Sequence, residues 1–162
     1  QSKISENYKN RGTEIHEAIK YKFLRNCEPA ETWIYEGNEQ RWRHLKPFLK
    51  AVTIIECEQF IWHKSGYAGT LDAVCELDGE LTLLDWKTSD RIKKRQWLDG
   101  YFTQTAAYAQ GYNFLNNTKI TQLGIVIITP EKLQIFTEND IDKYIDSWNE
   151  RLDKFKKINN NN

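Results

Sequence analysis

The sequence predicts an α/β fold, in which a mixed β-sheet is flanked by α-helices. Helical and extended patterns follow one another along the chain in the order helix, helix, three strands, helix, two strands, helix. One strand segment is an unbroken apolar run, which is typical of a strand that helices bury on both faces. The 162 residues, 40% of them hydrophobic, suffice for one domain with a substantial core.

The amino-terminal third of the chain predicts two helices. Apolar residues recur at helical spacing from about Gly12 to about Asn26, with Ile15, Ile19 and Phe23 on one side. A weaker pattern of the same period over residues 39–50 predicts the second helix.

Three strands are expected next, because the period of the apolar pattern changes to two. They cover residues 52–62, 67–77 and 81–86. Asp78 and Gly79 form a favoured hairpin turn between the last two of these strands. The second and third strands should therefore be antiparallel neighbours.

The rest of the chain predicts a helix over residues 98–115, the apolar strand over 120–128, a short strand over 132–136 and a final helix from about Asp140. We expect a single domain over residues 1–158, followed by a disordered tail over 159–162. The chain contains no methionine, so we also expect it to be truncated at its amino terminus.

Composition and charge exclude several classes of protein. Lys plus Arg and Asp plus Glu number 23 each, which argues against a histone-like protein that binds nucleic acid by bulk charge. No apolar run approaches the roughly 20 residues of a membrane span, and no signal peptide is visible. We expect an intracellular protein without a membrane partner, located in the cytoplasm, in a host cytoplasm if phage-encoded, or in a mitochondrion. The cysteines Cys27, Cys57 and Cys75 form no Cys-x-x-Cys pair, so we expect reduced thiols and no zinc site or iron–sulfur cluster.

One group of charged residues stands out in the predicted hairpin. Asp72 belongs to its first strand, and Asp85 and Lys87 lie near the end of its second strand. Because strand side chains alternate, Asp85 and Lys87 should point to one face and Trp86 to the other. The hairpin would bring Asp72 and Asp85 close enough to share a cation. The spacing alone leaves a second interpretation open, in which Lys87 is only a structural ion-pair partner of a partly buried Asp85.

The same residues resemble the signature of the PD-(D/E)XK nuclease superfamily, which is an Asp, a variable gap, an Asp or Glu, any residue and a Lys. Leu71 stands where a proline often precedes the first Asp. Further matches resemble the RecB-type exonuclease branch, closest to the group of the mitochondrial genome maintenance exonuclease and its phage-encoded relatives. These matches are a Gly-Thr-x-x-His helix start at Gly12 to His16, a Gln-x-x-x-Tyr helix at Gln104 to Tyr108, and the acidic strand segment at Ile55 to Cys57. The resemblance extends from Gly12 to about Phe155 and implies a restriction-endonuclease-like mixed sheet flanked by helices.

The resemblance implies a role for each matched residue. The carboxylates of Asp72 and Asp85, a nitrogen of His16 and the backbone carbonyl of Trp86 would bind Mg²⁺ or Mn²⁺, both of which suit oxygen ligands. Lys87 would position or deprotonate the attacking water. Further roles fall to Gln104 and Tyr108, which would hold Lys87 or contact DNA, and to Glu56, which would orient a metal-bound water. Glu58 remains an alternative to Glu56.

The segment after the third strand predicts a DNA contact. It combines basic side chains with aromatic ones, which suits single-stranded nucleic acid. The residues expected to contact DNA are Thr88, Ser89, Arg91, Lys93, Lys94, Arg95 and Tyr101. The expected function is a metal-dependent exonuclease that prefers single-stranded or open-ended DNA in repair, recombination or replication, with a helicase or recombination partner. The alternatives are a non-catalytic nucleic-acid-binding module with a vestigial site and a structure-specific or restriction-type endonuclease.

Overall fold

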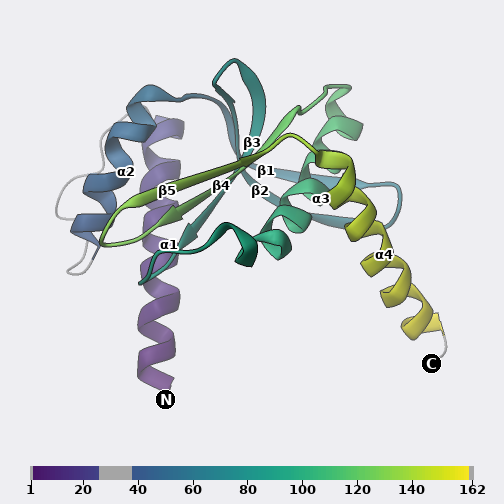
Figure 1. Ribbon diagram of the computed structural model, residues 1–162, viewed down its shortest axis with the longest axis horizontal. Coiled ribbons are helices and arrows are strands. Elements are labelled where there is room, and N and C mark those ends of the chain that lie inside the picture. The colour runs from purple at the N-terminus through teal and green to yellow at the C-terminus, as the bar shows by residue number, and fades with distance from the viewer. Residues whose placement is uncertain (1, 26–37, 161–162) are drawn as a thin grey trace.

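The computed structural model describes the backbone of residues 2–25 and 38–160, and the side chains within 12–23 and 38–159. The order of elements is that predicted, with helices first, a three-strand meander, a helix, two more strands and a last helix (Figure 1). The elements are α1 (Ser2–Arg25), α2 (Glu39–Ala51), β1 (Thr53–His63), β2 (Tyr67–Leu77), β3 (Glu80–Thr88), the short 3₁₀ helix η2 (Arg95–Trp97), α3 (Asp99–Asn116), β4 (Gln122–Ile128), β5 (Leu133–Glu138) and α4 (Ile141–Asn160).

The five strands form one mixed sheet in the order β1-β2-β3-β4-β5. Only the β3–β4 pair is parallel, because η2 and α3 cross over the sheet between these strands. Asp78 and Gly79 both have positive φ angles, 53° and 78°, as the predicted tight hairpin between β2 and β3 requires. The predicted α/β class, with a mixed sheet flanked by helices, is confirmed.

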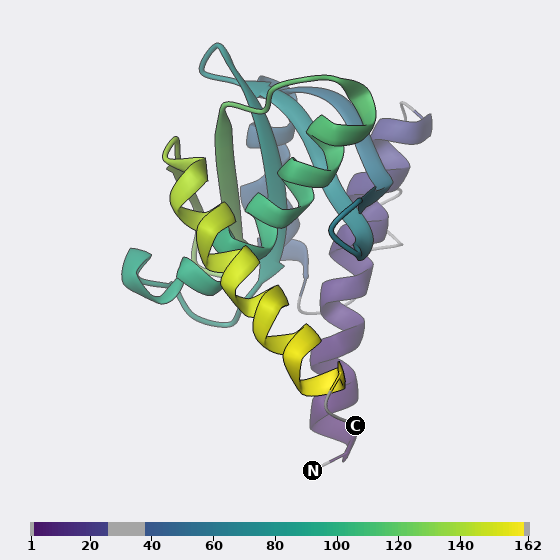
Figure 2. The same cartoon turned by 90° about the vertical axis from the view of Figure 1, so that its right-hand side faces the viewer.

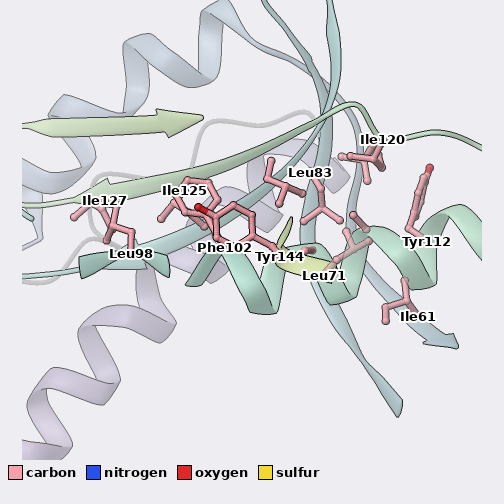
Figure 3. Close-up of a cluster of buried hydrophobic side chains, with 14 residues drawn as sticks. Ile61, Leu71, Leu83, Leu98, Phe102, Tyr112, Ile120, Ile125, Ile127 and Tyr144 are labelled. Atoms are coloured by element: carbon pink, nitrogen blue, oxygen red, sulfur yellow. The ribbon is translucent and has the colours of Figure 1, made fainter. Parts of the chain in front are cut away.

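Helices cover both faces of the sheet. On one face, α1 and α2 pack side chains such as Ile15 and Leu45 against Trp86 of β3. On the other face, α3 and α4 bring Phe102 and Tyr144 onto the sheet, and Figure 3 shows these two side chains among isoleucines and leucines of the strands. All seven residues of β4 are buried, which explains the unbroken apolar run in its sequence. Figure 2 shows α1 and α4 extending beyond the sheet at the same end of the molecule.

Two predicted boundaries differ from the structure. Helix α1 begins at Ser2 and not near Gly12. The sequence did not indicate this because the segment before Gly12 is polar apart from Ile4 and Tyr8, which are too few to form an apolar stripe. Its expected end at Asn26 lies outside the described residues. Helix α4 includes Asn159 and Asn160, so the expected tail is helical there, and residues 161–162 lie outside the described part of the chain.

Within the described residues, every helix is too short or too polar to span a membrane.

Candidate metal centre

The candidate site lies where β2 and β3 separate. The two strands pair from Leu77 and Glu80 as far as Ala73 and Leu84. Beyond that pair, the amide of Trp86 in β3 donates to Oδ2 of Asp72 at 2.7 Å. The separation thus places the Asp72 carboxylate between the strands, close to the end of β3.

Helix α1 reaches this point because Gly12 lacks a side chain. A Cβ at Gly12 would lie only 3.1 Å from Oγ1 of Thr88, at the end of β3. One helical turn later, Nε2 of His16 is 3.1 Å from the carbonyl oxygen of Trp86, and Nδ1 is 3.5 Å from Oδ1 of Asp72. As a hydrogen bond, this contact requires the hydrogen on Nε2, because a carbonyl oxygen only accepts; a metal ion held by both atoms would take the place of that hydrogen. The Gly-Thr-x-x-His segment, Gly12 to His16, therefore lies at the site.

The acidic residue that β1 contributes is Glu58, and the expectation for Glu56 is corrected. Ligand atoms of Glu58, His16 and Asp72 lie within 4.8 Å of one another. Glu56 instead lies near Tyr112 of α3, where burial and then this carboxylate raise the pKa of the Tyr112 hydroxyl to about 12. The two glutamates do not share a face, because Glu58 has a φ of 56°. This left-handed conformation interrupts the alternation of side chains, and for a non-glycine residue it is unfavourable and typical of functional sites.

Asp85 and Lys87 point to the same side of β3, as predicted, and Trp86 is buried on the other side. Nζ of Lys87 is 2.9 Å from Oδ2 of Asp85, an ion pair whose alignment falls short of a hydrogen bond. The ammonium group also lies 5.1 Å from the ring centre of Tyr101. Asp85 is only 3% exposed. Its Oδ2, the oxygen that pairs with Lys87, is buried and accepts no hydrogen bond.

The electrostatics of these groups favour a cation. Burial, and then repulsion by Asp85, raise the pKa of Asp72 to about 8. Burial also raises the pKa of Asp85, although Lys87 opposes the shift. Burial lowers the pKa of Lys87, but the charge of Asp85 outweighs it and the net shift is upward. The charged forms of Asp72 and Asp85 carry two negative charges, of which the ammonium group of Lys87 offsets one. A cation at this place would therefore stabilise the two carboxylates.

These residues fit a divalent metal ion. The cluster offers carboxylate, imidazole and carbonyl atoms from β1, β2, β3 and α1, and the buried Oδ2 of Asp85 lacks a hydrogen bond. Adjacent ligands in an octahedral Mg²⁺ shell lie about 3 Å apart. The distance between Nε2 of His16 and the carbonyl oxygen of Trp86 is 3.1 Å, which agrees with this spacing.

Helix α3 closes the side of the site next to Asp85. Nε2 of Gln104 donates to the hydroxyl of Tyr108 at 3.2 Å. The Tyr108 ring lies against the backbone of Gly69, where a Cβ would come within 2.7 Å of its Cε1. Burial and the charge of Asp85 raise the pKa of Tyr108. Tyr112, one turn further along α3, is buried in the core.

The basic segment after β3 divides into structural and exposed residues. Arg95 pairs with Asp99 and Glu138 at 2.9 Å each and lies over the ring of Phe102. The backbone of Lys93 is bonded on both sides to the side chain of Gln134 in β5. The exposed residues of the segment are Asp90, Arg91, Ile92, Lys94, Gln96 and Trp97. Thr88 contacts Gly12, and the Ser89 hydroxyl bonds to the backbone of Arg91. Arg95 thus has a structural role here, and Arg91 and Lys94 are the cations exposed to a ligand.

One buried network escaped the sequence analysis. Arg41 of α2 is 2% exposed and donates to the Ser89 carbonyl at 3.1 Å and to the Asp90 carboxylate at 2.5 Å. It also donates to Asn38, whose amide donates to Glu14 of α1 at 2.8 Å. The network joins α1, α2 and the end of β3, so it fixes the helix that carries His16. No local pattern could indicate it, since its bonds between α1, α2 and the end of β3 join residues 24 to 49 positions apart.

Comparison with known proteins adds little to these observations. No protein-family model matches the sequence, and no curated protein matches it. Among 14 chains of solved structures that match, a crystal structure of SSO0001 shares 19% identity with a TM-score of 0.39, over 86% of this chain and 68% of that one. Neither value is high enough to transfer a function.

Proposed function

We propose that this chain is a divalent-metal-dependent deoxyribonuclease of the PD-(D/E)XK type, with a restriction-endonuclease-like fold and a site of the RecB-type branch. It hydrolyses phosphodiester bonds in intracellular DNA and prefers single strands or open ends, as DNA repair, recombination and replication require. The observation that carries the proposal is the convergence of Asp72, Asp85 and Lys87 where β2 and β3 separate, with His16 of α1 beside them.

The residues of the site have different chemical roles in this proposal. Glu58, Asp72 and His16, whose ligand atoms form one cluster, would hold the Mg²⁺ or Mn²⁺ ion, together with the carbonyl of Trp86 and the carboxylate of Asp85 beside them. When bound, this ion supplies a Lewis acid for the scissile phosphate and lowers the pKa of a water molecule.

Lys87 acts next to these ligands. Its ammonium group, held beside Asp85 at 2.9 Å, orients the attacking water and offsets charge that develops on the phosphate. Such an interaction is stronger in the transition state than in the ground state, which is the condition for catalysis. Gln104 and Tyr108 restrict the space next to Asp85.

Two alternative functions, a non-catalytic binding module and a restriction-type endonuclease, would use the same residues differently. A non-catalytic binding module would have no need of a buried carboxylate pair with a lysine, which is costly without a cation. A restriction-type endonuclease would not require a free end. His16 and the Gln104–Tyr108 pair favour the exonuclease, by the resemblance of their motifs.

The test is cleavage of end-labelled single-stranded and double-stranded DNA with Mg²⁺ or Mn²⁺. The parent should cut, and Asp85→Asn and Lys87→Ala should not. Asp153→Asn and Lys154→Ala, which change exposed residues of α4 in the same way, are the matched controls and should cut as the parent does. Binding without metal-dependent cleavage would favour the module. Cleavage of circular DNA at the rate of linear DNA would favour the endonuclease.

A further inference from the structure

The hairpin of β1 and β2 continues past the metal centre and carries exposed aromatic side chains. Phe60 is 67% exposed and Trp62 is 46% exposed. Phe114 of α3 is 42% exposed, and its ring meets that of Trp62 edge-on with centres 5.3 Å apart. We call Phe60, Trp62 and Phe114 the aromatic strip. Large apolar side chains that are exposed together mark binding surfaces more often than isolated ones do.

The aromatic strip begins beside the metal centre. Phe60 follows Glu58 by two residues on β1, and its partner Thr70 precedes Asp72 by two residues on β2. Phe60 and Trp62 are alternate residues of β1, beyond the irregular backbone of Glu58, so they share a face and lie about 7 Å apart along the strand. Figure 1 shows the turn of this hairpin on the side of the molecule away from α1 and α2. A strand of substrate that leaves the metal centre along the hairpin would therefore pass over the strip.

The charges of the hairpin suit a nucleic acid. Residues 59–71 contain no Asp or Glu, although 23 of the 162 residues of the chain are acidic. The far end of the hairpin is positive, because Lys64 is exposed there and Nζ of Lys156 donates to the carbonyl of Ser65 at 2.5 Å. No carboxylate of the hairpin beyond Glu58 would repel a phosphate. Aromatic rings beside positive charge are the combination with which proteins bind single strands.

We infer that the aromatic strip stacks on unpaired bases of single-stranded DNA and so directs the strand to the metal centre. The inference rests on the proposed function, because the aromatic strip can direct a strand to the metal centre only if that centre acts on DNA. Side chains about 7 Å apart leave room for one base between them, since stacked bases rise by about 3.4 Å. Paired bases are already stacked on one another, so the strip selects unpaired DNA.

The experiment measures binding without cleavage. Labelled oligothymidylates of increasing length are titrated with the protein in EDTA at fixed salt, and fluorescence anisotropy gives the dissociation constant. Phe60→Ala and Trp62→Ala should each weaken binding about tenfold, within the range known for loss of one base–aromatic stack. Trp62→Phe should restore most of the affinity. Ile55→Ala is the matched control, because Ile55 is an apolar residue of β1 that is 53% exposed on the other side of Glu58.

A second substrate separates stacking from charge. An oligonucleotide of abasic sites keeps the phosphates and lacks the bases, so the parent and Trp62→Ala should bind it equally. Equal weakening on the abasic strand, or parent-like binding of thymidylate by both alanine variants, would overturn the inference. So would a concentration-dependent dimer in sedimentation that Phe60→Ala abolishes, because the strip would then be covered by a second copy.

The two proposals fail in different ways. A parent that cuts single-stranded DNA, with strip variants that bind and cut equally well, refutes only the role of the strip. A parent that binds thymidylate through the strip but cuts no DNA with Mg²⁺ or Mn²⁺ refutes the nuclease and supports the strip. Because both side chains are exposed, thermal melting of the variants should match that of the parent.

Discussion

Replacement of Asp72 by asparagine should stabilise the metal-free protein at neutral pH. Asp72 and Asp85 both have raised pKa values, chiefly because they are buried. A carboxyl with a raised folded-state pKa retains a proton that the unfolded chain has released. Its contribution to stability is therefore greatest at low pH and is lost as the pH rises from about 3.8, the ordinary pKa of an aspartate, to about 8, the pKa of Asp72 in the folded protein.

The size of the effect follows from one retained proton. Stability should fall by about 1.4 kcal/mol for each pH unit within that window, or by nearly 3 kcal/mol between about pH 5 and pH 7. Asp72→Asn lacks this slope and keeps a side-chain oxygen for the Trp86 amide.

The assay is urea denaturation of the parent and of Asp72→Asn in EDTA across this pH range. The difference in free energy of unfolding should grow with pH in favour of the variant. Addition of Mg²⁺ or Mn²⁺ should raise the stability of the parent and have much less effect on the variant. A difference that is constant with pH, or a variant less stable than the parent at neutral pH, would refute the electrostatic reasoning.

Three further predictions concern single residues. Glu58→Gln should weaken Mn²⁺ binding, measured by calorimetry, about tenfold or more, whereas Glu56→Gln should leave it unchanged, because only Glu58 lies in the cluster; equal effects would contradict the placement. Gly69→Ala should lower the rate of DNA cleavage up to about 100-fold, because its Cβ displaces the Tyr108 ring, and unchanged kinetics would show that the ring is dispensable. Arg41→Ala should lower the free energy of unfolding by about 3 kcal/mol, since it removes a buried partner; a loss below about 1 kcal/mol in urea denaturation would mean that the network is not stabilising.

Local patterns were sufficient to predict the elements and much of the site. Periods of two and of three to four residues located the strands and helices, because one face of each is buried. The alternation along β3 predicted that Asp85 and Lys87 share a side, and the structure confirms it. Gly12 and His16 also lie at the site, as their motif indicated.

The features that were missed depend on contacts between distant segments. The left-handed backbone of Glu58 reverses the side of β1 on which the glutamates lie, and nothing in a run of alternating residues signals such a change. Arg95 appeared to be one of several cations in a basic run, but its partners Glu138 and Tyr144 are more than 40 residues away. The helix before Gly12 was missed because a polar helix has no apolar period.

Trp86 connects the candidate site to the hydrophobic core. Its amide is bound by Asp72, its carbonyl faces His16, and its ring is 1% exposed and packed edge-on against Phe48 of α2. A single residue therefore couples the hydrophobic packing under α2 to Asp72 and His16 of the candidate site. If the proposed function holds, substitutions at Phe48 would shift the affinity for the ion by moving the peptide group of Trp86, although Phe48 itself lies in the interior.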